Sequence, residues 1–264
     1  MHDLVFITGA SSGIGAALVR LIAAQKIALI LTGRNETELS HLAEEAKSLG
    51  APSVEFFAAD LATKEGIHSA QESIRTHAPD LVINNAGFGL YGDVALLDLE
   101  KQQAIIDVNV SATFELSAVA VKTLLEREKE GVIMNISSMA AFPPFPGFAA
   151  YSASKQFVNH FSLCLDYEVR SKDIRVLVAC PGVVHSKFRE RAGGAPTTAQ
   201  SPGVMTPEYA AQQIWWQIKK KKKLHIFNWR YRFLVWMTRI LPNAIIAGLL
   251  HQVVQALNGH TEDE

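Results

Sequence analysis

The chain has 264 residues, of which 48% are hydrophobic, and a formal net charge of −1. This length and composition suffice for one well-buried α/β domain. The near-neutral charge provides no global positive field to attract nucleic acid, so we expect no nucleic-acid partner.

The first residues run directly from Met1 into a short apolar stretch at 4–7. A signal peptide needs a basic start and a longer apolar segment, so none is expected. No uninterrupted apolar run reaches the roughly 18–20 residues that span a bilayer. The two cysteines, Cys164 and Cys180, have apolar neighbours and no metal-ligand spacing, so we expect both to be buried and reduced. These features predict a cytoplasmic protein without a metal site.

Short apolar runs alternate with amphipathic stretches along most of the chain. This alternation is typical of parallel strands joined by helical crossovers, and apolar strands without polar alternation are covered by helices on both faces. We therefore predict an α/β fold with a doubly wound parallel seven-stranded sheet. The expected strands are 4–7, 28–32, 54–58, 81–84, 132–136, 174–179 and 224–227, and the clearest helices are 14–25, 36–49 and 151–169.

A glycine-rich turn, Thr-Gly-Ala-Ser-Ser-Gly-Ile-Gly at residues 8–15, connects the first strand to the first helix. Glycines allow the backbone to turn sharply and approach a pyrophosphate, and the helix N-terminus offers free N–H groups to the anion. A turn without a ligand is the alternative, but the strand–turn–helix context near residue 10 favours a Rossmann-type nucleotide site. The candidate phosphate-binding residues are Gly9, Ser11, Ser12, Gly13, Ile14 and Gly15.

The end of the second strand indicates which cofactor is preferred. Residues 31–34 read Leu-Thr-Gly-Arg, with no acidic side chain to bond a ribose 2′-hydroxyl. The planar fork of Arg34 suits a 2′-phosphate, although a solvated arginine is the alternative. We therefore expect NADP(H), with NAD(H) less favoured.

Tyr151 and Lys155 are four residues apart at the start of a predicted helix, so their side chains share one face. A neighbouring ammonium lowers the pKa of a tyrosine, which makes the tyrosine usable as an acid or base. An exposed helical pair is the alternative. Ser138 lies 13 residues before Tyr151, just beyond the fifth strand, at the sheet edge where ligands bind.

These residues, with Asn-Asn-Ala-Gly at 84–87 and Asn109, make the chain resemble the short-chain dehydrogenase/reductase family over roughly residues 4–227. The resemblance implies that Tyr151 is the general acid or base and that Ser138 holds the substrate oxygen. It implies that Lys155 lowers the pKa of Tyr151 and binds the nicotinamide ribose, and that Asn109 anchors a relay water. It also implies cofactor contacts from Tyr151 itself and from Asp60, Leu61, Asn85, Ala86, Gly87, Pro181, Gly182 and Val184.

The carboxyl tail combines basic and apolar segments. Five lysines at 219–223 are expected to close a helix, and an apolar stripe follows Pro242. We predict one catalytic domain over residues 1–228 and a helical extension over 229–264, a tail that resembles the DltE-like subgroup. The stripe is formed by Ile245, Ile246, Leu249, Leu250, Val253, Val254 and Leu257.

We expect this stripe to contact a second subunit or the substrate pocket, in a homodimer or homotetramer. Binding to a membrane surface is the less favoured alternative, because the opposite face of the stripe carries no lysine or arginine. The loop at 193–207 is a candidate lid or binding loop.

The predicted function is reversible hydride transfer between NADP(H) and a small hydrophobic carbonyl compound or secondary alcohol. Alternatives are reduction of a 3-oxoacyl thioester and a non-catalytic NADP(H) sensor; a membrane-surface structural protein is supported by the tail alone. An apolar substrate pocket is expected from Phe88, Tyr91, Phe142, Phe145 and Phe148.

Overall fold

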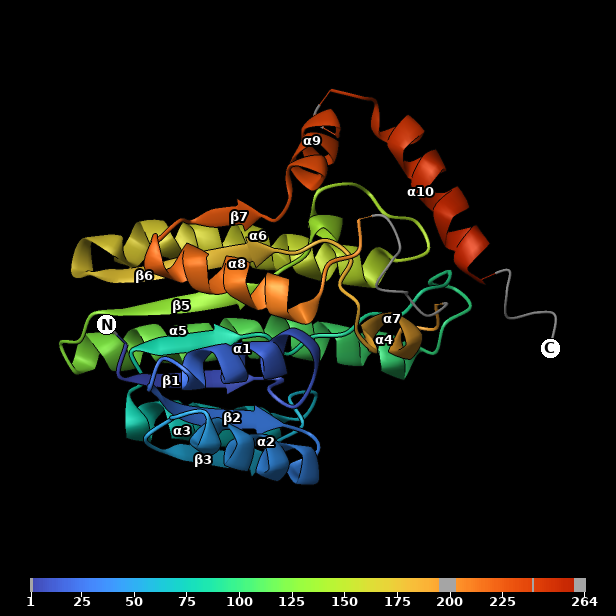
Figure 1. Ribbon diagram of the computed structural model, residues 1–264. Coiled ribbons are helices and arrows are strands. Elements are labelled where there is room, and N and C mark those ends of the chain that lie inside the picture. The colour runs from blue at the N-terminus through green and yellow to red at the C-terminus, as the bar shows by residue number, and fades with distance from the viewer. Residues whose placement is uncertain (1, 195–202, 239, 259–264) are drawn as a thin grey trace.

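The computed structural model describes residues 2–194, 203–238 and 240–258. It confirms the predicted seven-stranded parallel sheet, with each strand within one residue of its expected bounds (Figure 1). The strands are β1 (Leu4–Thr8), β2 (Ala28–Gly33), β3 (Val54–Ala58), β4 (Leu81–Asn84), β5 (Gly131–Ile136), β6 (Ile174–Cys180) and β7 (Leu224–Ile226).

The strand order is β3-β2-β1-β4-β5-β6-β7, so the direction of winding reverses at β1. On one side Ile7 pairs with Leu31 of β2, and on the other side Ile7 pairs with Ile83 of β4. Such a switch point leaves a crevice at the carboxyl ends of the strands, where nucleotides bind in open α/β sheets. The predicted glycine-rich turn follows β1 and therefore lies in this crevice.

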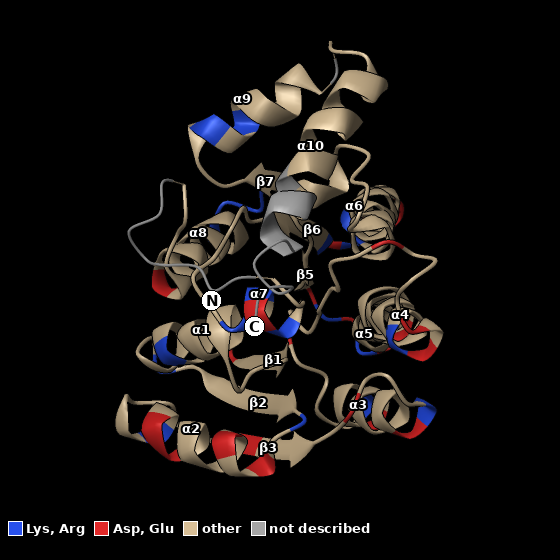
Figure 2. Ribbon diagram, turned by 90° about the vertical axis from the view of Figure 1, so that its right-hand side faces the viewer, with Lys and Arg blue, Asp and Glu red and all other residues tan. Residues whose placement is uncertain are grey.

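Helices cover both faces of the sheet, which explains why its strands are apolar on both sides (Figure 2). One face is covered by α1 (Gly13–Ala23), α2 (Glu36–Ser48) and α8 (Pro207–Lys219). The other face is covered by α3 (Lys64–His77), α4 (Leu99–Ile106), α5 (Thr113–Glu126) and α6 (Ala149–Val169).

Two expectations from the sequence are wrong in detail. Helix α8 ends at Lys219, so the lysine run continues through the turn before β7 and does not close the helix. Cys164 is exposed, whereas Cys180 is buried as expected. Cys164 has apolar neighbours in sequence, but the 3.6-residue period of α6 turns Ser162 and Asp166 inward and Cys164 toward solvent.

A continuous helical stretch, Leu99–Glu126, is long and apolar enough to cross a membrane by length and composition. It comprises α4, a π-helical turn (Asp107–Ala112) and α5. Half of its most apolar window is buried within the protein, where it packs against α3 and α6. Its apolar character is therefore explained by its place in the layer that covers the sheet.

The tail forms α9 (Trp229–Met237) and α10 (Asn243–Asn258), which extend from the sheet as an angular pair (Figure 1). In α10 the predicted stripe is only partly covered: Ile246 and Val254 are buried, while Ile245 and Leu249 are exposed. The side chains of Val253 and Leu257 lie outside the described residues. The expected loop at 193–207 falls largely on undescribed residues, and α8 begins at Pro207, capped by Thr206.

Candidate active site

The glycine-rich turn has the geometry of an anion-binding site. Gly9 and Gly13 have φ angles of +61° and +54°, which only glycine adopts without strain. A Cβ on Gly15 would overlap the carbonyl oxygen of Gly9 and lie 2.7 Å from Asn85 Nδ2, so the tight turn requires glycine at residue 15. Ser12 caps α1 without a side-chain hydrogen bond, and the first turn of α1 has no acidic residue. Its N–H groups are thus available to a phosphate.

Asn85 has a structural role that the sequence did not show. Its Nδ2 donates to the carbonyl oxygens of Thr8 and Gly9, both at 3.0 Å. The hydroxyl of Thr8 accepts from the backbone N–H groups of Asn85 and Ala86, also at 3.0 Å. These bonds attach the end of β4 to the glycine-rich turn, so Thr8 is a supporting residue that sequence reasoning missed.

The two residues expected near the adenosine ribose lie at the same edge of the sheet. Arg34 follows β2 and is exposed, and within the described ranges its guanidinium forms no ion pair or hydrogen bond. The Ser11 hydroxyl lies 3.4 Å from a Cβ built on Gly33, which places the glycine-rich turn beside Arg34. Asp60 is exposed and accepts from the N–H of Ala62 at 3.0 Å, while Leu61 is buried.

Ser138, Tyr151 and Lys155 converge where β5 ends and α6 begins. All three are buried, and Ser138 lies near enough to the Tyr151 hydroxyl to lower the pKa of the tyrosine. Lys155 Nζ donates to the carbonyl oxygen of Ile136 at 3.0 Å and lies 5.8 Å from the centre of the Tyr151 ring. The structure therefore brings together the three residues that the sequence placed in one site.

The titration of this group differs from the expectation. Burial raises the pKa of Tyr151, and the nearby Ser138 side chain opposes that shift only in part. Burial lowers the pKa of Lys155 to about 8. In this structure Lys155 therefore does not determine the pKa of Tyr151. The loss of hydration shifts the pKa of each group more than the charge of its neighbour does. Tyr151 is protonated at neutral pH, as a general acid requires.

Asn109 lies in the π-helical turn between α4 and α5 and is fully buried. Its Nδ2 donates to the carbonyl oxygen of Phe88 and to the hydroxyl of Ser154, both at 2.9 Å, and its Oδ1 accepts from the N–H of Phe88. A Cβ on Gly87 would come within 2.9 Å of both Asn109 Oδ1 and Lys155 Nζ. Gly87 therefore keeps open a space that the amide and the ammonium share, and π-turns are frequent at functional sites.

An aromatic cluster covers Tyr151. Tyr91 stacks on Phe148 with ring centres 4.2 Å apart, and Phe148 lies 4.4 Å from Tyr151. Phe145 packs on the edge of Phe148, and Phe188 of α7 (Phe188–Arg191) lies 5.4 Å from Tyr151. The sequence predicted three of these members and missed Phe188, which is far in sequence from the other three.

Two members of the predicted pocket lie elsewhere. Phe142 packs with Val158 and Cys180, and Phe88 packs against the core between the sheet and α5. Both were expected at the site because they are close to it in sequence. However, the chain turns between Phe142 and Phe145, so only the latter faces Tyr151.

The segment after β6 is attached to the tail through Tyr231 of α9. The carbonyl oxygen of Pro181 accepts from the N–H of Met139, and Val184 pairs with Met205. A Cβ on Gly182 would overlap the Tyr231 ring. The predicted nicotinamide-binding residues thus lie between the Ser138 turn and α9.

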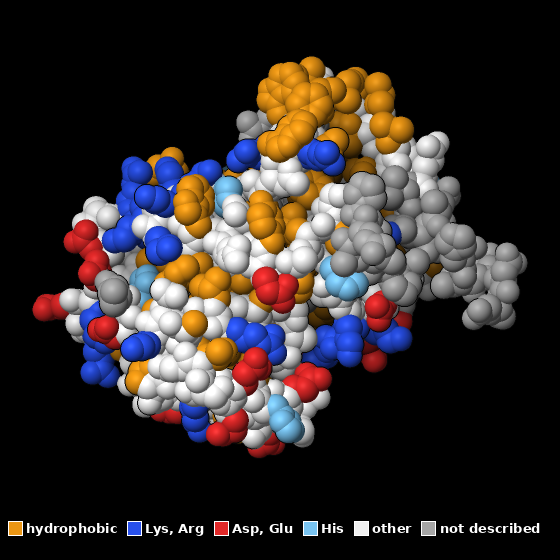
Figure 3. Space-filling view, in the orientation of Figure 1, with side chains coloured by type: hydrophobic (Ala, Val, Ile, Leu, Met, Phe, Trp, Pro, Cys, Tyr) orange, Lys and Arg blue, Asp and Glu red, His pale blue; other side chains and the backbone are white. Residues whose placement is uncertain are grey.

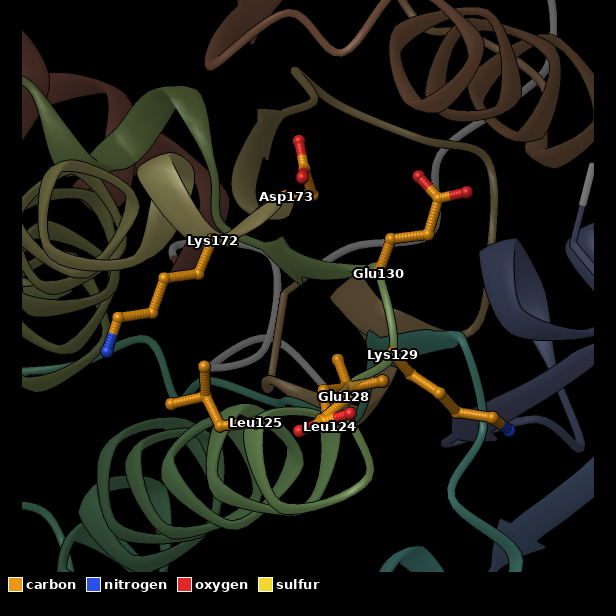
Figure 4. A pocket seen from close by; sticks show the side chains of 7 residues that line it. All are labelled: Leu124, Leu125, Glu128, Lys129, Glu130, Lys172 and Asp173. Carbon is orange, nitrogen blue, oxygen red and sulfur yellow. The ribbon is translucent and has the colours of Figure 1, made fainter.

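A separate open pocket of about 450 Å³ lies at the opposite edge of the sheet (Figure 4). It is lined by the end of α5, the turn before β5 and the turn before β6, and its charged residues include Glu130, Lys172 and Asp173. It is therefore distinct from the Tyr151 site. Among the described residues, no group of three or more His, Cys, Asp or Glu side chains could hold a metal ion.

Comparison with known proteins agrees with this geometry. The family described as short chain dehydrogenase matches residues 3–195. The chain is 34% identical over 202 residues to a protein named sulfoacetaldehyde reductase 2 from Chromohalobacter salexigens, covering 74% of this chain and 78% of that protein. It is 30% identical over 246 residues to an uncharacterized oxidoreductase from Myxococcus xanthus, covering 92% and 94%. A short-chain dehydrogenase from Sphingobium yanoikuyae in complex with NADPH superimposes with a TM-score of 0.81 at 27% identity, covering 88% and 91%.

Proposed function

Because the chain belongs to the short-chain dehydrogenase family, and is therefore an oxidoreductase, we propose that it reduces the carbonyl group of a small apolar substrate with NADPH. One observation carries this proposal: Ser138, Tyr151 and Lys155 are buried together beneath an aromatic cluster, and burial keeps Tyr151 protonated. The same site can oxidise the corresponding alcohol. Because its pKa is raised, Tyr151 stays protonated at neutral pH, which is the state that reduction requires, whereas oxidation first requires loss of that proton.

Each residue of the site has its own role in the proposed reaction. Ser138 Oγ holds the substrate oxygen, and Tyr151 Oη donates the proton to it. Lys155 Nζ is close enough to the space kept open by Gly87 to bond a ribose hydroxyl, and Asn109 lines the same space. The nicotinamide supplies the hydride when it is bound. Catalysis by a positioned acid of this kind typically contributes about 10²–10⁴-fold.

The cofactor preference rests on Arg34. Its guanidinium, which forms no ion pair or hydrogen bond with the part of the chain that the structure describes, follows β2 beside the turn that presents the N–H groups of α1. A guanidinium at this position suits the 2′-phosphate of NADP(H), and no carboxylate follows β2 directly. The solved relative from Sphingobium yanoikuyae is in complex with NADPH, which supports the same preference.

We assign the other predicted cofactor residues to the same crevice. We propose that Asp60 and Leu61 contact the adenine and that Ala86 and Gly87 line the adjacent ribose. We propose that the segment containing Pro181, Gly182 and Val184 runs alongside the nicotinamide. Asn85 acts mainly by holding the glycine-rich turn in place.

We further propose a cytoplasmic homodimer of the DltE-like subgroup, built through α5 and α6. These helices expose Phe114 and Phe157, and Phe161 packs against both rings at 5.4 and 5.6 Å. Aromatic residues of this kind are enriched in subunit interfaces. This surface supports a subunit contact better than the tail does.

NADPH oxidation measured against apolar ketones, aldehydes, quinones and 3-oxoacyl thioesters tests the proposal. Turnover of a simple ketone or aldehyde that is lost in Tyr151→Phe supports it. A preference for 3-oxoacyl thioesters favours the second candidate function, which the same catalytic residues would serve. Tight NADPH binding without turnover of any class indicates a cofactor sensor.

A further inference from the structure

The outer side of α9 exposes a group of large apolar side chains. Only Tyr231 and Val235 of this helix are buried, while Trp229 is 65% exposed, Phe233 52% and Trp236 53%. Leu234 and Ile240 are exposed beside them, and Ile245 and Leu249 of α10 are exposed as well. We use the name α9 face for the surface formed by Trp229, Phe233, Leu234, Trp236 and Ile240. Figure 3 shows apolar side chains gathered over α9, with basic side chains directly beneath them.

Charge is distributed unevenly between this region and the rest of the protein. Residues 209–261 contain eight lysines and arginines and no aspartate or glutamate, whereas the whole chain has a net charge of −1. The remaining residues therefore carry a net charge of −9. Two of the eight, Arg230 and Arg232, are exposed on α9 itself. A partner of the α9 face should therefore be anionic and able to accept aromatic side chains.

A pocket of about 480 Å³ lies between α8, β7 and the start of α9. Its lining includes both arginines, the ring of Trp229 and the side chains of Tyr209 and Asn228. The guanidinium of Arg230 lies 5.8 Å from the centre of the Trp229 ring. Arginine donors beside an amphipathic aromatic ring match the boundary between lipid phosphates and acyl chains.

We infer that the α9 face binds the surface of an anionic phospholipid membrane. Tryptophan and phenylalanine would enter the interfacial region, while Arg230 and Arg232 face the phosphates. The expectation against membrane contact depended on the neutral side of α10. The structure instead presents the basic and aromatic residues together on α9.

A second copy of the chain fits this face less well. A two-fold contact places the same surface against itself, so the arginines of one copy would meet those of the other. No acidic residue between 209 and 261 could compensate this repulsion. The aromatic surface on α5 and α6 lies elsewhere and remains available for dimerisation, so membrane binding and a dimer are compatible.

Sedimentation of the full-length protein with vesicles tests the inference. We expect pelleting with vesicles that contain phosphatidylglycerol, little pelleting with phosphatidylcholine alone, and a loss of binding at high salt. Arg230→Gln with Arg232→Gln should weaken binding about 30-fold, at about 1 kcal/mol per basic residue. Trp229→Ser with Phe233→Ser should weaken it about tenfold or more, since less apolar area is buried.

Matched controls remove equivalent groups from other surfaces. Lys122→Gln with Arg127→Gln removes two exposed charges from the end of α5, and Leu96→Ser with Leu99→Ser removes two exposed apolar side chains. Both control pairs should bind vesicles as the wild type does. Equal binding to both lipid compositions, or unchanged binding by the α9 variants, overturns the inference. Conversion of a dimer to monomers by Trp229→Ser with Phe233→Ser also overturns it, because the α9 face is then a subunit interface.

Discussion

The ring of Tyr231 in α9 lies directly on Gly182, so closely that any side chain at residue 182 would overlap it. The Tyr231 hydroxyl donates to the carbonyl oxygen of Gly203 at 2.8 Å and accepts from the N–H of Val183 at 3.3 Å. One tyrosine of the tail therefore holds together two segments, one of which is the predicted nicotinamide-binding segment. The tail is consequently part of the architecture of the site.

Tyr231→Phe is expected to weaken NADPH binding about fivefold, since it removes a hydrogen-bonding hydroxyl worth about 1 kcal/mol and keeps the ring. Fluorescence titration with NADPH measures the effect. Tyr209→Phe on α8 is the control, because it removes a hydroxyl from a half-exposed tyrosine away from this segment. Equal affinities of Tyr231→Phe and the wild type would show that the hydroxyl does not order the segment.

Most of the fold could be predicted from the sequence because apolar periodicity and glycine-rich turns are local signals. The motifs likewise predicted that Ser138, Tyr151 and Lys155 would meet at the carboxyl edge of the sheet. The roles of Thr8, Phe188 and Tyr231 could not be predicted, because each arises from contacts between segments far apart in the chain. Cys164 shows the same limit: its neighbours in sequence are apolar, but its helix turns it outward.

The pKa of Tyr151 could not be predicted for a related reason. Helical spacing places Tyr151 and Lys155 on one face, but their effect on each other depends on burial, which sequence spacing does not reveal. In the structure burial raises the pKa of the tyrosine and lowers that of the lysine. The loss of hydration therefore dominates both groups.

Tyr151→Phe should reduce kcat by about 10²–10⁴-fold, because it removes the acid that protonates the substrate oxygen. NADPH binding should stay close to that of the wild type, since the contacts proposed for Lys155 and the glycine-rich turn remain. Steady-state kinetics and a separate binding titration distinguish the two effects. Turnover close to that of the wild type would contradict the assigned role.

Arg34→Ala should weaken NADPH binding by about 1.5–3 kcal/mol, the usual contribution of a hydrogen bond to a charged group. NADH binding should change little, because NADH has no 2′-phosphate. Calorimetric titration with both cofactors measures the difference. An equal loss of affinity for NADH and NADPH would show that Arg34 supports the local structure and does not select the cofactor.

The proposed dimer predicts that Phe114→Ser with Phe157→Ser yields monomers in sedimentation equilibrium, because both exposed rings would leave the interface. Leu49→Ser on α2 is the control, since it removes an exposed apolar side chain from the opposite layer. If the Phe114→Ser, Phe157→Ser variant remains dimeric, the interface lies on another surface.

Lys155→Met should alter the pH dependence of stability of the cofactor-free protein. Burial lowers the pKa of Lys155 from 10.5 to about 8 in the folded state. Between these values the unfolded chain binds a proton that the folded chain lacks, so this group makes unfolding more costly as pH rises. Below about pH 8 both states are protonated, and the penalty for burying the ammonium is fully present. The wild type thus carries a destabilisation at neutral pH that it largely loses near pH 10.

The free energy of unfolding of Lys155→Met relative to the wild type should therefore fall by about 2–3 kcal/mol between pH 7 and pH 10. The variant also leaves the carbonyl of Ile136 without its hydrogen bond, but that cost is the same at both pH values and cancels in the comparison. Urea denaturation at the two pH values measures the difference. Lys122→Met, at an exposed position on α5, should show no such change. A difference between Lys155→Met and the wild type that is independent of pH would mean that the ammonium is solvated in the folded protein.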